Sequence, residues 1–75
     1  MVLVGQRYKH FKGHIYEILN IAYDTENPNK KYVVYKNIED HKVWVREYEM
    51  FTSKVDKEKY PNISQEYRFE LLEWK

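Results

Sequence analysis

The chain of 75 residues has no cysteine, only two glycines and two prolines, and no long apolar segment. Without cysteine, neither a disulfide framework nor a thiolate metal site can form, which suits a reducing compartment. An apolar run at residues 2–4 is far shorter than the roughly 20 residues needed to cross a bilayer. We therefore expect a cytoplasmic protein without a membrane-spanning segment.

The chain also has no large excess of positive or negative charge. It contains 13 Lys and Arg residues and 12 Asp and Glu residues, which gives a net charge of +1. Lysines and glutamates alternate along most of the chain, which argues against a polybasic or an acidic tail. Aromatic residues are abundant instead, with eight tyrosines, three phenylalanines and two tryptophans. Tyr and Trp suit a pleated, half-buried surface, so the composition favours strands over helices.

Short alternating segments bounded by turn residues predict the strands. We expect them at residues 6–10, 14–23, 31–37, 43–46 and 67–74. In the second segment the alternation changes phase near Leu19 or Asn20, which predicts a β-bulge. Residues 47–51 predict one short helical turn, and residues 55–65 a long loop. The prediction is a single all-β domain over residues 1–75, an SH3-like bent barrel of about five strands with one short helical turn.

Several short motifs carry a family resemblance. They are YKHFKG at residues 8–13, YEIL at 16–19, VVY at 33–35, WVR at 44–46, EMF at 49–51 and RF at 68–69. In this order and spacing they resemble the DUF1653 family of small bacterial and phage proteins, over nearly the whole chain. The family pattern commonly has proline after the WVR segment and glycine in the second strand, where this chain has Glu47 and Asn20. The resemblance implies a domain of uncharacterised function.

Aromatic and basic residues from four neighbouring segments would form a patch if they share a face. They are Tyr8, His10, Tyr16, Tyr35, Trp44 and Arg46. Bases stack on such rings, and small barrels bind nucleic acids or peptides through similar surfaces. The competing interpretation is that these rings pack in the core, which we favour for Tyr16 and Tyr35. For Trp44, the sequence favours neither burial nor partial exposure. The candidate ligand-binding residues are Tyr8, His10, Lys12, Trp44 and Arg46, four of which (Tyr8 excepted) the family resemblance also singles out.

Signatures of catalysis and of metal binding are weak. His10, His14 and His41 could together bind a metal, but no cysteine or carboxylate accompanies them at a known ligand spacing. The chain has no glycine-rich phosphate loop and no nucleophile elbow. Glu17 and Glu49 could form a catalytic carboxylate pair, yet salt bridges with the many Lys and Arg are the better interpretation. We expect a non-enzymatic protein with no cofactor and no metal.

Two functional hypotheses follow. The first is a binding module that contacts a nucleic acid or a peptide through the aromatic and basic surface. The alternative is a structural or assembly domain, in which an exposed strand edge at residues 32–37 pairs with a second copy or with a larger protein. The oligomeric state and the choice between nucleic acid and protein stay open at this point.

Overall fold

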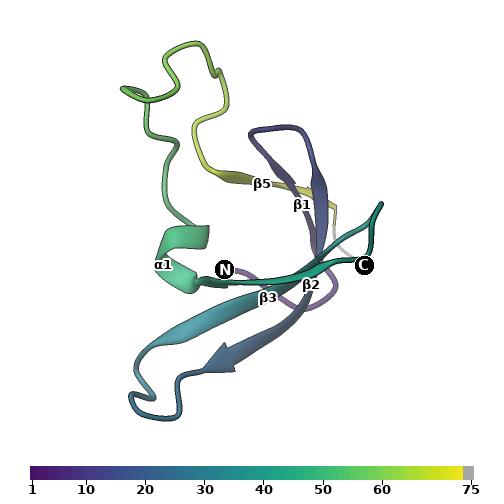
Figure 1. The fold of residues 1–75 in the computed structure, drawn as a ribbon, viewed down its shortest axis with the longest axis vertical. Helices are drawn as coiled ribbons and strands as arrows, with labels where there is room; N and C mark the ends of the chain where they lie inside the picture. The colour runs from purple at the N-terminus through teal and green to yellow at the C-terminus, as the bar shows by residue number, and fades with distance from the viewer. Residues whose placement is uncertain (74–75) are drawn as a thin grey trace.

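The computed structural model describes residues 1–73 and contains five strands and one helical turn (Figure 1). They are β1 (Arg7–His10), β2 (Ile15–Tyr23), β3 (Lys31–Asn37), β4 (Val43–Glu47), α1 (Tyr48–Phe51) and β5 (Phe69–Glu73). All ladders are antiparallel, in the spatial order β4-β3-β2-β1-β5. The predicted mainly β fold with one short helical turn is confirmed. The last predicted strand begins two residues later than expected, and its residue 74 lies outside the described residues.

The sheet does not close into the predicted barrel. Across residues 1–73, β4 and β5 are the two edges, and no ladder joins them. The chain between these strands passes through α1, whose Phe51 packs against the rings of Tyr35 on β3 and Phe69 on β5, at centroid distances of 5.3 and 3.9 Å. Ring packing from α1 thus joins β3 and β5, and no backbone ladder joins β4 to β5 among the described strands. The SH3-like comparison stays a prediction.

The long strand β2 contains the predicted bulge. Its register against β3 shifts between Ile18 and Asn20. An extra residue bends and twists the strand, and it allows Ile18 and Ile21 both to pack into the core. At the β1–β2 turn, Gly13 has a φ of +105° and donates its N–H to the His10 carbonyl at 2.8 Å. A glycine suits this turn because other residues rarely adopt such a φ.

The core lies on one face of the sheet and is largely aromatic. Its buried members are Val2, Tyr8, Ile18, Val33, Tyr35, Phe51 and Phe69. The rings of Phe51 and Phe69 stack with centroids 3.9 Å apart, and Tyr8 meets Phe51 edge-on at 5.4 Å. Such ring pairs stabilise a fold by about 0.5–1.5 kcal/mol beyond the area they bury. Aromatic packing therefore takes the place of the leucine-rich core that this chain lacks.

The strand β3 is central, since it pairs with β2 on one side and with β4 on the other. The prediction that residues 32–37 form an open edge is therefore wrong, because both sides of this strand are already hydrogen-bonded. The apolar run at residues 32–35 marks a central strand, whose core face is buried at Val33, Tyr35 and Asn37 and whose other face is half-buried. The open edges are β4 and β5.

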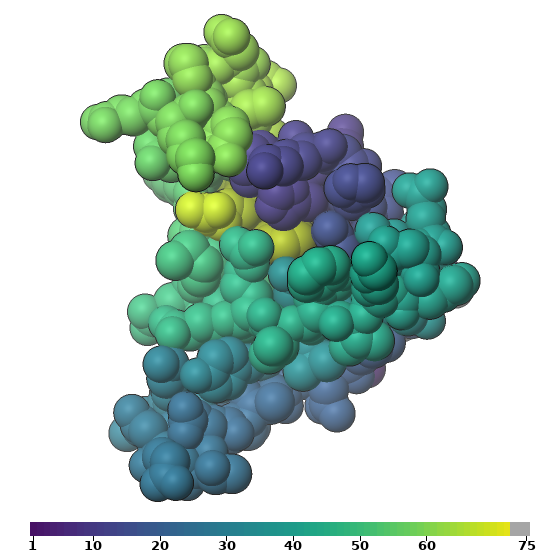
Figure 2. Space-filling view, in the orientation of Figure 1, coloured from purple at the N-terminus to yellow at the C-terminus, as the bar shows by residue number. Residues whose placement is uncertain are grey.

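Two loops project from the ends of the molecule. Figure 2 shows residues 52–66 in green at one end and the β2–β3 loop in blue at the other. The first of these loops is fastened by Lys57, whose ammonium group donates to the carbonyls of Ile63 and Gln65, the latter at 2.9 Å. Tyr60 packs on Phe11 with a centroid distance of 4.9 Å.

No helix among the described residues is long and apolar enough to span a bilayer.

Candidate functional site

The strand register brings the predicted patch residues onto one face. Opposed residues of an antiparallel ladder share a face, and Tyr8 lies opposite Tyr16, while Tyr35 lies opposite Trp44. Residues two apart on a strand also share a face, which adds His10 and Arg46. This is the face that carries the core. We term it the aromatic face and define it by Tyr8, His10, Tyr16, Tyr35, Trp44, Arg46 and Phe69.

The most exposed residue of the aromatic face is Trp44, on the edge strand β4. Tyr8 and Tyr35 are buried, at 8% and 4% exposed, whereas Trp44 is 48% exposed. The Tyr8 hydroxyl donates to Oε1 of buried Gln6 at 3.0 Å, so its ring belongs to the core and offers no surface to a ligand. Tyr16 is half-buried, as are His10 and Arg46. Trp44 is open because it lies on an edge strand.

Arg46 lies above the aromatic core. Its Nε donates to the Tyr35 hydroxyl at 3.3 Å, and its guanidinium carbon is 5.8 Å from the Phe69 ring centroid. A guanidinium over a ring is attracted by the negative face of the ring. Because the group has five N–H donors, the contact with Tyr35 fixes its place and leaves donors that can bind an anion.

His10 connects this region to the β1–β2 turn. Its ring lies 4.4 Å from the Phe11 centroid and 4.9 Å from that of Phe69. Its Nδ1 accepts the backbone N–H of Lys12 at 3.1 Å. The exposed Lys12 ammonium group lies 5.5 Å from the Tyr60 ring centroid. The histidine therefore packs against the aromatic core on one side and holds the cationic turn on the other.

The pKa of His10 shows that positive charge gathers here. Burial, the largest cause, and the charges of four basic neighbours together lower this pKa from its ordinary value of 6.5 to about 4. In order of effect they are Arg46, Lys12, Arg68 and His14. His10 is therefore neutral at pH 7. The other basic groups make this end of the aromatic face electropositive although the whole chain has a net charge of only +1.

Arg68 and Phe69 belong to this region but were not among the predicted site residues. The Arg68 Nε donates to Ser53 Oγ at 2.8 Å, which fastens the arginine to the end of the helical turn. Phe69 lies opposite His10 across the β1–β5 ladder. The alternation within residues 67–71 could have indicated that Phe69 faces inward. It could not show that β5 pairs with β1, because that contact joins the two ends of the chain.

The histidines and carboxylates do not converge on a metal site. His41 lies in the β3–β4 turn with a φ of 65°, whereas His10 and His14 flank the β1–β2 turn. Within residues 1–73, no group of three His, Asp or Glu side chains could hold a metal ion together. Glu17 forms an ion pair with Arg7 at 3.4 Å.

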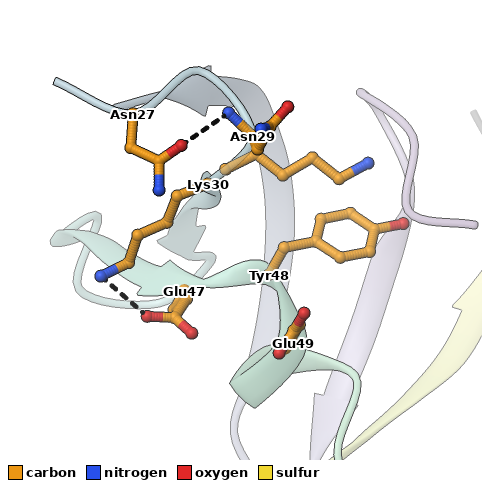
Figure 3. A pocket seen from close by; sticks show the side chains of 7 residues that line it. Asn27, Asn29, Lys30, Glu47, Tyr48 and Glu49 are labelled. Carbon is orange, nitrogen blue, oxygen red and sulfur yellow. Dashed lines mark hydrogen bonds and ion pairs between the residues drawn. The ribbon is translucent and has the colours of Figure 1, made fainter. Parts of the chain in front are cut away.

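A separate surface pocket lies between the β2–β3 loop and α1 (Figure 3). Its volume is about 310 Å³, and none of the predicted site residues lines it. Lys30 and Glu47 form an ion pair across it at 3.3 Å, and the Lys31 ammonium group lies 4.1 Å from the Tyr48 ring centroid. Both lysines thus have partners within the protein, and this mixed-charge lining selects no ligand class.

The fold and the aromatic face together define a small antiparallel β-sheet domain with an aromatic core and a locally electropositive surface. The chain belongs to the family described as Protein of unknown function (DUF1653), whose model matches residues 6–71. The predicted family resemblance is thereby confirmed. No curated protein and no solved structure matches the chain.

Proposed function

We propose that this domain is a non-enzymatic binding module whose aromatic face binds single-stranded nucleic acid. The observation that supports the proposal most strongly is the position of Trp44. It is 48% exposed on the same face as Arg46 and beside the electropositive region around His10. A flat exposed ring on the same face as the Arg46 guanidinium offers a stacking surface for a base and a cation for a flanking phosphate.

A single strand suits this surface better than a duplex does, because its bases are free to stack on Trp44. The available cations are Arg46, Arg68 and Lys12, which come from β4, the loop before β5 and the β1–β2 turn. An acidic group, Asp40, lies near Tyr16 at the β3–β4 turn and contributes to the raised pKa of that tyrosine, after burial and Tyr35. The phosphates are therefore expected towards His10 and away from Asp40.

Fluorescence anisotropy with a labelled single-stranded oligonucleotide tests this proposal. Binding should weaken with salt, with a slope of log K against log salt of about −2, because about three neutralised phosphates each contribute about −0.7 for a single strand. A duplex of the same sequence should bind more weakly. A slope near zero or no binding at low salt would contradict the proposal, and binding of an anionic peptide in its place would assign the surface to a protein partner.

Matched variants locate the contact. Trp44→Ala should weaken binding by about 5- to 150-fold, the equivalent of about 1–3 kcal/mol for one stacked base. Lys12→Ala should reduce the salt slope by about 0.7, because one phosphate contact is lost. Lys9→Ala is the control, since Lys9 is exposed on the opposite face of β1. Equal effects of Lys9→Ala and Lys12→Ala would mean that the oligonucleotide binds without regard to the aromatic face.

A further inference from the structure

The edge strand β4 is unusually open to pairing. Its residues Val43, Trp44 and Val45 carry no charge and are 57%, 48% and 64% exposed. Its ladder with β3 runs over five consecutive pairs without a register shift, so no bulge bends it away from a partner. Proteins usually protect such edges with charges, prolines or bulges, and none of these interrupts residues 43–45.

The opposite edge, β5, shows that protection. Its sequence places Glu70 and Glu73 among the apolar residues, and its ladder with β1 has a register shift between Arg7 and Tyr8. Charged residues and an irregular ladder both oppose edge-to-edge pairing. The two edges of one sheet therefore differ, and only β4 presents a regular uncharged segment.

The hydrogen-bond pattern shows which β4 amides face outward. The Asn37 N–H donates to the Lys42 carbonyl at 3.0 Å, and the Ile38 N–H donates to the Ile15 carbonyl at 3.1 Å. Since the direction of bonding alternates along an antiparallel strand, the backbone groups of Trp44 and Arg46 point to β3. Those of residues 43, 45 and 47 point to the free edge.

We propose that two copies of this chain associate through antiparallel pairing of β4 with β4, with the two-fold axis at Val45. In this register Val45 lies opposite the second copy's Val45, and residue 43 lies opposite residue 47. All three outward-facing residues then bond to the second chain, which gives continuous hydrogen bonding across the joined sheets. A two-fold interface of this kind uses the same patch on both copies.

The side chains are self-complementary in this register. Trp44 lies opposite Arg46 of the second copy, twice per dimer and on the same face. These are non-hydrogen-bonded pairs of the new ladder, in which side chains approach most closely, and a guanidinium beside an indole ring is a favourable cation–π pair. On the other face the two Val45 side chains contact each other.

Neighbouring registers are poorer. A shift of two residues in one direction sets Arg46 opposite Arg46, and like charges directly opposed destabilise a sheet. A shift in the other direction sets Trp44 opposite Trp44 and brings Lys42 opposite Arg46 of the second copy. Each shift also leaves one outward-facing residue without a partner on β4 of the second copy, residue 43 in the first case and residue 47 in the second. Only the register centred on Val45 satisfies the hydrogen bonds and the charges together.

The dimer is expected to be weak. A single five-residue strand pair buries less than the about 1,200–2,000 Å² of stable, specific interfaces, so association should fall in the micromolar to millimolar range, about −8 to −4 kcal/mol. Sedimentation equilibrium of the full chain should show a mass that rises from 9.4 kDa towards twice that value as concentration increases from about 10 µM to about 1 mM.

Substitutions on the two edges test the assignment. Val45→Lys places like charges opposite each other and should leave a monomer at every concentration. Val45→Pro should do the same without disturbing the ladder to β3, because it removes an outward-facing N–H. Leu72→Lys on β5 is the control, at a position 47% exposed, and should dimerise like the unaltered chain. Circular dichroism establishes that each variant is folded.

An isotope-filtered NOE between the Trp44 indole and the Arg46 side chain of a differently labelled copy would support the register directly. A monomer at about 1 mM for the unaltered chain overturns the proposal, given the weakest association expected for this interface. So does a dimer that survives both substitutions of Val45, or one that Leu72→Lys abolishes.

Discussion

Replacing Phe51 by alanine should remove a large share of the stability of the fold. Phe51 is 1% exposed, stacks on Phe69 at 3.9 Å, and meets Tyr8 and Tyr35 edge-on at 5.4 and 5.3 Å. Truncating a buried phenylalanine costs about 3–5 kcal/mol. A domain of this length has a free energy of unfolding of about 4–11 kcal/mol, at 0.05–0.15 kcal/mol per residue. The variant should therefore keep at most about 8 kcal/mol, and at the lower end of the range it should be unfolded.

Urea unfolding followed by circular dichroism measures the loss. Phe51→Leu keeps an apolar side chain but removes the ring contacts, so it should remain folded and lose about 1–2 kcal/mol. The adjacent Met50 is 47% exposed, and Met50→Ala should change stability by less than about 0.5 kcal/mol. A loss below about 1.5 kcal/mol for Phe51→Ala, or equal losses for Phe51 and Met50, would refute the claim that the helical turn anchors the core through one ring.

Two further predictions concern polar groups. The folded-state pKa of His10 is about 4, below its ordinary value of 6.5. As the pH falls, the unfolded chain therefore binds the proton at a higher pH than the folded chain does. The contribution of His10 to the free energy of unfolding should be fully present above pH 6.5 and should fall as the pH drops towards 4. NMR titration of the imidazole checks this value, and Arg46→Ala should raise it; an unshifted pKa near 6.5 would contradict the burial and charge assigned to His10. Asn37 is 7% exposed and its Oδ1 accepts the backbone N–H groups of Glu39 and Asp40 at 2.8 and 3.3 Å. Asn37→Ala should cost about 1–3 kcal/mol in thermal or urea unfolding, because turn donors lose their partner, and an unchanged stability would show that water replaces the amide without loss.

Local features of the fold could be predicted from the sequence. The apolar run bounded by polar residues gave the limits of β3, residues 31–37, and the change of phase in residues 14–23 gave the bulge beside Leu19. Both signals depend on neighbours within one strand. The side-chain period of two also predicted that Trp44 and Arg46 share a face, and their register against β3 places that face over the core.

Features set by distant contacts could not be predicted in the same way. The pairing of β1 with β5 and the packing of Phe51 against Tyr35 and Phe69 join segments far apart in the chain. For this reason the sequence did not show that the sheet stays open or that Arg68 approaches His10. Nor does alternation reveal depth, so Tyr8 was included among surface candidates although its ring is buried.

The central claim is that the aromatic face, and no other surface, binds the ligand. A ¹H–¹⁵N chemical-shift titration with a short single-stranded oligonucleotide tests it residue by residue. The largest shifts are expected at the Trp44 indole N–H, at Arg46 and in the Lys12 turn, whereas Lys9 and Lys36 on the opposite face should not shift. Shifts confined to that opposite face, or none at Trp44 under conditions of saturation, would contradict it.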